Sequence, residues 1–134
     1  MNINIRNYLE DLEARLNVDE EQRLLGLWKG FVEHRSQDPI FTPLRNPTKP
    51  GNLGWPEVNV NDAIQDSTFN IMLLEQLGLV NELISSTNGN LPMIRANYGS
   101  NILATLLGCQ LHMMDRELNT LPGALPLCDG CSCQ

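Results

Sequence analysis

Residues 62–86, DAIQDSTFNIMLLEQLGLVNELISS, decide the fold class of this 134-residue chain. Apolar side chains recur here mostly at steps of three and four, the spacing that places them on one face of an α-helix. They are Ile64, Phe69, Met72, Leu73, Leu77, Val80, Leu83 and Ile84. We expect Asn61 or Asp62 to cap this helix and Gly78 to bend or split it. Turn-forming residues at 85–90 predict its end.

Two further helices are expected before this one. The first spans 3–16, where Ile5, Tyr8, Leu9, Leu12 and Leu16 recur at helical spacing. The second spans about 19–35. Asp19 is expected to cap it, because Gln22 follows at the spacing of a capping box. Gly26 and Gly30 lie four residues apart inside this helix and predict a close helix contact, since an interior glycine costs about 1 kcal/mol relative to alanine.

Residues 36–61 form a proline-rich arm, which holds five of the eight prolines. Connections without secondary structure are uncommon beyond about 15 residues in a compact domain. An extended arm packed on a partner, an ordered loop and a flexible lid are the alternatives. Flexible linkers are polar and rich in glycine and serine, whereas apolar side chains are interspersed here, so we favour a docked arm. These side chains are Phe41, Leu44, Leu53, Trp55 and Val58.

The last third of the chain predicts short elements. We expect a strand at 92–97, a helix at 101–107, a second strand at 110–114 and a loop at 119–127. The expected fold class is therefore α+β and predominantly helical. We expect a single domain over 1–134. Its parts are a helical pair (1–35), the arm (36–61), a helix with a β/α unit (62–127) and a Cys-rich tail (128–134).

Composition excludes several classes of function. The chain is 42% hydrophobic and carries nine Lys and Arg against sixteen Asp and Glu, a net charge of −7. Binding to phosphate backbones and to anionic membrane surfaces depends on clustered cations, so we expect neither nucleic acid nor membrane as a partner. The first residues show no charged leader followed by an apolar run. We expect a cytoplasmic protein whose cysteines are thiols or metal ligands.

Arg95 is an unusual cation in its surroundings. Residues 62–134 contain seven acidic residues, and Arg95 and Arg116 are the only basic ones. One interpretation is a structural salt bridge. The other is an anion-binding group at the carboxyl end of a strand, where α/β folds bind their ligands.

Several short motifs resemble the uroporphyrinogen decarboxylase-like superfamily, and within it the branch that includes corrinoid-dependent methyltransferases. They are Ile94-Arg95-Ala96-Asn97-Tyr98-Gly99, Leu107-Gly108, Met113-Met114-Asp115 and Thr120-Leu121-Pro122. The resemblance is clearest over 90–127 and implies a relative of the TIM barrel whose first strand is 92–97. It implies a decarboxylase or a methyltransferase, with Arg95, Asn97 and Tyr98 binding substrate near the mouth of the barrel.

The chain departs from that family in two respects. The double-arginine pattern Arg-Gln-Ala-Gly-Arg of the decarboxylases and the His-x-Cys zinc signature of the methyltransferases are both absent. A complete barrel also needs at least about 200 residues. We therefore expect a truncated or N-terminal segment without a complete active site of its own. It would either associate with itself, as a homodimer or a higher oligomer, or pair with the remainder of a barrel.

The cysteines at the C-terminus suggest an alternative function. Cys128, Cys131 and Cys133 include one CxxC spacing, and Cys109, His112 or another chain would supply the fourth ligand of a structural zinc ion. The alternative protein is a small helical interaction module, in which zinc stabilises the fold. A tail without any ligand and a redox motif are the other interpretations, and a single CxxC does not decide among them.

Overall fold

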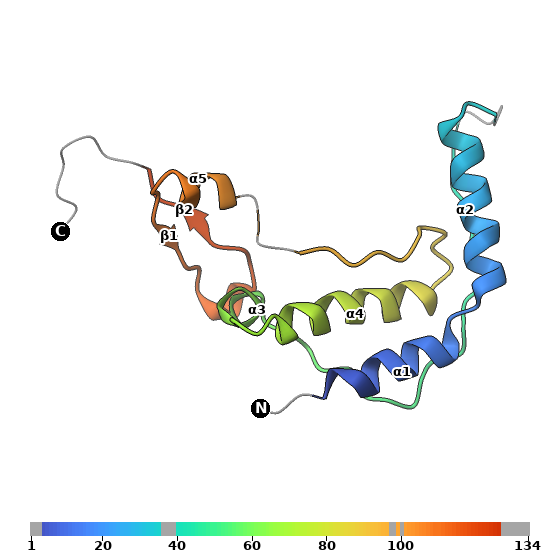
Figure 1. Ribbon diagram of the computed structural model, residues 1–134, viewed down its shortest axis with the longest axis horizontal. Coiled ribbons are helices and arrows are strands. Elements are labelled where there is room, and N and C mark those ends of the chain that lie inside the picture. Colours follow the sequence, from blue (N-terminus) through green and yellow to red (C-terminus); the bar gives the residue numbers. More distant parts are fainter. Residues whose placement is uncertain (1–3, 36–39, 97–98, 100, 127–134) are drawn as a thin grey trace. The chain divides into compact units, whose positions relative to one another are not determined.

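The structure is a computed structural model that describes residues 4–35, 40–96, 99 and 101–126. These residues form five α-helices, one 3-10 helix and a two-stranded antiparallel sheet (Figure 1). The expectation of a predominantly helical α+β fold is confirmed, and the described residues form no barrel. The chain divides into two compact units. Unit 1 comprises Met1–Pro56 and Leu73–Arg95, and unit 2 comprises Glu57–Met72 and Ala96–Gln134.

The two N-terminal helices are present as predicted, but the cap of the second differs. Helix α1 spans Ile5–Arg15 and helix α2 spans Val18–Val32. Asn17 caps α2, because its side-chain oxygen accepts hydrogen bonds from the amides of Asp19 and Glu20. The prediction that Asp19 is the cap is therefore wrong. Asp19 lies in the first turn, where its negative charge suits the helix dipole.

The stretch that decided the fold class forms two helices instead of one. Helix α3 spans Val60–Gln65 and helix α4 spans Asn70–Ile84. The break lies at Asp66, whose carboxylate accepts hydrogen bonds from the amides of Thr68 and Ile71. Asn59 caps α3 in place of Asn61 or Asp62, since its side chain accepts from the amide of Asn61. Gly78 does not split α4, which continues through it.

The core of unit 1 lies between α1 and α4. Leu12, Leu77, Val80 and Ile84 are buried together, and Ile5, Tyr8, Trp55 and Leu73 pack against them. Trp55 comes from the arm and meets the Tyr8 ring edge-on, with the ring centroids 4.9 Å apart. The arm also bonds to the end of α4, because the amide of Thr48 donates to the carbonyl of Ile84. The proline-rich arm is thus docked on its own chain.

Unit 2 contains the short elements of the C-terminal third. They are α5 (Ile102–Leu106), β1 (Leu111–His112), the 3-10 helix η1 (Arg116–Leu118) and β2 (Gly123–Ala124). Strand β1 lies within the predicted strand 110–114. Its antiparallel partner β2 falls in the stretch predicted to be a loop, with Leu111 opposite Ala124.

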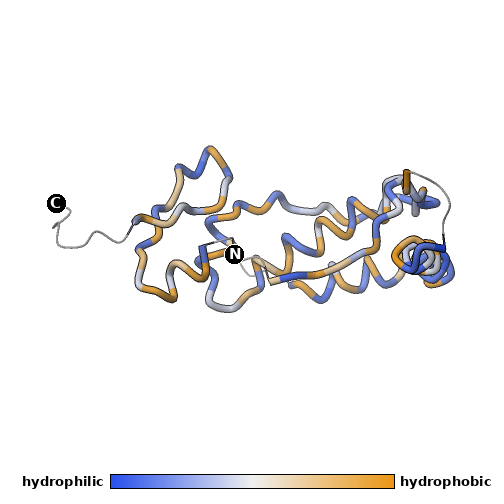
Figure 2. The backbone as a smooth tube through the Cα atoms, turned by 90° about the horizontal axis from the view of Figure 1, so that it is seen from above, coloured by the Kyte–Doolittle hydropathy of each residue, from blue (hydrophilic) through white to orange (hydrophobic). Residues whose placement is uncertain are grey.

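The strand predicted at 92–97 is absent from its described part, residues 92–96. The physical reason is the lack of a neighbour, since a strand requires a second chain segment for its backbone hydrogen bonds and no described strand lies beside this one. Figure 2 shows hydrophobic and hydrophilic residues interspersed along the chain. No helix in the described part is long and apolar enough to cross a membrane.

Candidate functional site

Unit 1 contains a cavity of about 550 Å³ between α2, α4 and the segment 90–95. Its apolar lining consists of Trp28, Leu79, Val80, Leu83, Leu91 and Met93, and its polar lining consists of Gln76, Asn90 and Arg95. Ligand sites in proteins usually have volumes of about 300–1,000 Å³, with mostly apolar walls and a few polar groups. The size and lining of this cavity suit a small ligand that has an apolar body.

An aromatic cluster holds one wall of the cavity in place. The indole Nε1 of Trp28 donates a hydrogen bond to the carbonyl of Gly89 at 2.9 Å. Phe41 meets the Trp28 ring edge-on at 4.8 Å between centroids and stacks on Phe31 at 4.4 Å. The position of Trp28 is therefore fixed both by a hydrogen bond and by ring packing.

Gln76 and Arg95 line this cavity with polar groups that can form further hydrogen bonds or ion pairs. Gln76 is only 2% exposed, and its side-chain oxygen accepts a long hydrogen bond of 3.4 Å from the amide of Arg95. The side-chain nitrogen of Gln76 is buried without an acceptor among the described residues. The exposed guanidinium of Arg95 likewise has no ion pair in the described part of the chain.

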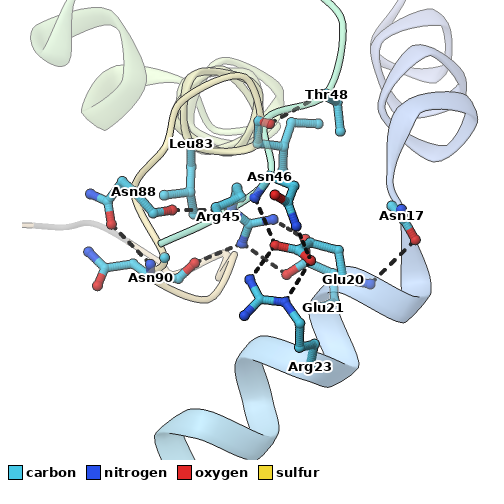
Figure 3. Close-up of polar contacts among 12 residues, drawn as sticks. Asn17, Glu20, Glu21, Arg23, Arg45, Asn46, Thr48, Leu83, Asn88 and Asn90 are labelled. Atoms are coloured by element: carbon cyan, nitrogen blue, oxygen red, sulfur yellow. Dashed lines mark hydrogen bonds and ion pairs between the residues drawn. The ribbon is translucent and has the colours of Figure 1, made fainter. Parts of the chain in front are cut away.

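A group of polar side chains, which we term the Arg45 clamp, ties the arm and the turn after α4 to α2 (Figure 3). It comprises Glu20, Glu21, Arg23, Arg45 and Asn46. The buried guanidinium of Arg45 donates to both carboxylate oxygens of Glu21. It also donates to the carbonyl oxygens of Asn88 at 3.2 Å and Asn90 at 2.8 Å.

Glu20 forms the second half of the clamp. Its carboxylate accepts two hydrogen bonds from the Arg23 guanidinium. It accepts two more from Asn46, one from the backbone amide at 2.8 Å and one from the side-chain amide at 3.1 Å. The hydrogen bonds from Arg23, followed by the one from the Asn46 amide, lower the pKa of Glu20 from 4.5 to about 2. Because Asn90 lines the cavity, the clamp links the cavity wall to the start of α2.

The second arginine of the C-terminal half is already paired. In unit 2, Arg116 donates to both carboxylate oxygens of Asp62, at 2.6 and 2.5 Å. The hydrogen bonds from Arg116 lower the pKa of Asp62. The structural salt bridge that was one interpretation of Arg95 is not found among the described residues, where Arg116 is the paired arginine of this half.

Five of the other predicted site residues lie outside the described residues. They are Asn97, Tyr98, Cys128, Cys131 and Cys133. Cys109 is a half-buried free thiol. No group of three or more metal-ligating side chains occurs in the part of the chain that the structure describes.

Gln76, Trp28 and Arg45 are the site residues that the sequence analysis missed. Gln76 carried a signal, because it is a polar residue four positions after Met72 and four before Val80, on the apolar face of a helix. Trp28 and Arg45 carried none, since their partners lie far away in the sequence.

Comparisons of this chain with models of protein families, with curated proteins and with solved structures find no match.

Proposed function

We propose that this chain is the N-terminal segment of a protein like the uroporphyrinogen decarboxylases and the corrinoid-dependent methyltransferases, and that it has no complete catalytic site alone. The proposal is based on residues 91–96, a segment with exposed apolar side chains. They lack strand partners in the described part, and the adjacent Met93 and Ile94 are 70% and 55% exposed. Consecutive apolar residues are typical of a parallel strand that is covered on both faces. In a barrel, neighbouring strands and helices would supply that cover.

The cavity supports a substrate with an acidic group and an apolar body. Arg95 offers a guanidinium without a partner in the described chain, and guanidinium groups bind carboxylates through two parallel hydrogen bonds. The apolar side chains of Trp28 and Leu79 would cover the body of such a molecule. In the family that the sequence resembles, arginines of the early barrel hold substrate carboxylates, which agrees with this role of Arg95.

The experiment compares octanoate with octanol as probes of the cavity. Binding is followed by NMR through the indole N–H resonance of Trp28, which lies in the cavity wall. We expect octanoate to bind more tightly than octanol, and Arg95→Gln to weaken octanoate binding by about tenfold, because a charge-assisted hydrogen bond is lost. Arg35→Gln, an exposed arginine of the same unit, is the matched control.

Two results would contradict the proposal. Equal binding of octanol and octanoate would show that Arg95 does not bind the carboxylate of the ligand. Decarboxylation of a porphyrinogen, or methyl transfer from a methylated corrinoid, by the purified chain would show that its catalytic site is complete.

A further inference from the structure

Helix α2 presents a stripe of exposed residues, of which Val18, Leu25 and Val32 are apolar. Val18, Gln22, Leu25, Lys29 and Val32 follow one another at steps of four, three, four and three, and all five are exposed. This is the spacing of the contact seam of two paired helices. The buried residues of α2, Glu20 and Leu24, lie on the opposite side of the helix. The stripe is therefore a second face, separate from the face that contains the buried residues of α2.

Gly26 and Gly30 lie outside this stripe, because at about 100° per residue they point about 80° and 120° away from its centre around the helix. Nothing in the described chain lies within 4 Å of a Cβ added at either position. The close helix contact predicted from their spacing is thus not made with another described part of this chain.

The stripe is complementary to a second copy of itself. In an antiparallel pair of α2 helices centred on Leu25, residues equally far before and after Leu25 lie opposite each other. Val18 then lies opposite Val32, and Leu25 packs on its own counterpart. Lys29 lies opposite Glu21, so two ion pairs form, related by the two-fold axis. A parallel pair would instead place Lys29 opposite Lys29, which is repulsive.

We propose that α2 forms the interface of an antiparallel homodimer, in which Leu25 lies on the two-fold axis and Lys29 pairs with Glu21 of the second copy. An interface of this kind is isologous, because the same patch serves both subunits. Glu21 retains the capacity for this pairing, since an ionised carboxylate can accept about four hydrogen bonds and Arg45 uses two of them. The proposal rests on α2 alone and does not depend on the family resemblance.

The test measures the mass of the complete chain by light scattering and sedimentation over a wide range of concentrations. We expect a reversible monomer–dimer equilibrium. Leu25→Glu should weaken dimerisation by at least about tenfold, because it places two like charges on the axis. Leu27→Glu is the matched control, since Leu27 is 42% exposed and Leu25 is 40% exposed, and Leu27 lies on the other side of α2. We expect this control to dimerise normally.

A second variant tests the arrangement of the two copies. Lys29→Glu should weaken an antiparallel dimer by placing two carboxylates together, whereas a parallel dimer would change little. A wild-type chain that stays monomeric, or a dimer unaffected by Leu25→Glu, would overturn the proposal. A dimer insensitive to Lys29→Glu would overturn the antiparallel arrangement.

Discussion

Arg45 donates to both carboxylate oxygens of Glu21, which lies 24 residues earlier in the chain. The pair is well shielded, because the Arg45 side chain is 1% exposed and that of Glu21 is 17% exposed. The net contribution of a buried ion pair is often small, whereas removal of one partner is costly because it leaves the other charge buried and unpaired. The pair therefore holds α2, the arm and the turn at 88–90 together.

The first prediction concerns the loss of the Arg45–Glu21 ion pair. Arg45→Met should lower the free energy of unfolding by about 3–5 kcal/mol, because the largely buried Glu21 carboxylate loses both of its hydrogen bonds from Arg45. The carbonyls of Asn88 and Asn90 also lose a donor. The double variant Arg45→Met/Glu21→Leu should recover part of that loss, since neither charge remains. Urea denaturation of the two variants and the wild type measures both effects.

An exposed ion pair provides the control. Arg35 pairs with Glu33, and both side chains are more than half exposed. Arg35→Met should change the free energy of unfolding by no more than about 1 kcal/mol. If Arg45→Met were as mild as this control, the clamp would have no structural importance.

The second prediction concerns Gly89, where the chain passes close to the arm. A Cβ added to Gly89 would lie 2.2 Å from the carbonyl oxygen of Pro43, which is a backbone atom and has little freedom to move. Gly89→Ala should therefore lower the free energy of unfolding by about 1–3 kcal/mol. Gly54→Ala is the control, because nothing lies within 4 Å of its added Cβ. Equal thermal stability of the two variants would contradict the close approach of these segments.

The helices could be predicted where residues close together in the sequence determine them. The spacing of apolar residues and the polar residues at the ends predicted α1 and α2 to within a few positions. The break between α3 and α4 was missed because the side chain of Asp66 competes for backbone amides, and such local hydrogen bonds do not alter the apolar pattern.

The remaining differences between the sequence analysis and the structure arise from contacts between residues that lie far apart in the sequence. The strand expected at 92–97 depends on a neighbouring strand, and sequence pattern alone does not supply one. Arg45 lies in a proline-rich arm, and its partners are found 24, 43 and 45 residues away. Arg95 was recognised as a candidate from the scarcity of basic residues around it. Trp28, which lines the same cavity, has no comparable signal in the sequence.

The third prediction concerns the buried amide of Gln76. Its nitrogen has no acceptor among the described residues, and an unsatisfied buried donor costs about 1–3 kcal/mol. Gln76→Met keeps a similar volume and removes that donor. We expect the variant to raise the free energy of unfolding by about 1 kcal/mol, measured by urea denaturation. A loss of stability would show that the amide has an essential partner in solution.

The fourth prediction concerns acid stability and follows from Glu20. Its pKa falls from 4.5 to about 2 in the folded chain, chiefly through the hydrogen bonds from Arg23. Between these two values the unfolded state binds more protons than the folded state. The stabilisation by Glu20 is therefore fully present above pH 4.5, decreases as the pH falls, and is lost below about pH 2. Glu20→Gln should accordingly reduce the dependence of unfolding free energy on pH in this window.

A second variant tests the cause of that dependence. Arg23→Gln removes the side chain that contributes most to the low pKa of Glu20, so the carboxylate should titrate at higher pH. NMR titration of the Glu20 carboxyl carbon measures this directly, and urea denaturation at a series of pH values measures its effect on stability. The loss of stability below pH 4.5 should be smaller in Arg23→Gln than in the wild type and should end at a higher pH, because the folded and unfolded pKa values of Glu20 then lie closer together. An unchanged Glu20 titration would contradict the assignment of the shift to Arg23 and would leave the Asn46 amide as its main cause.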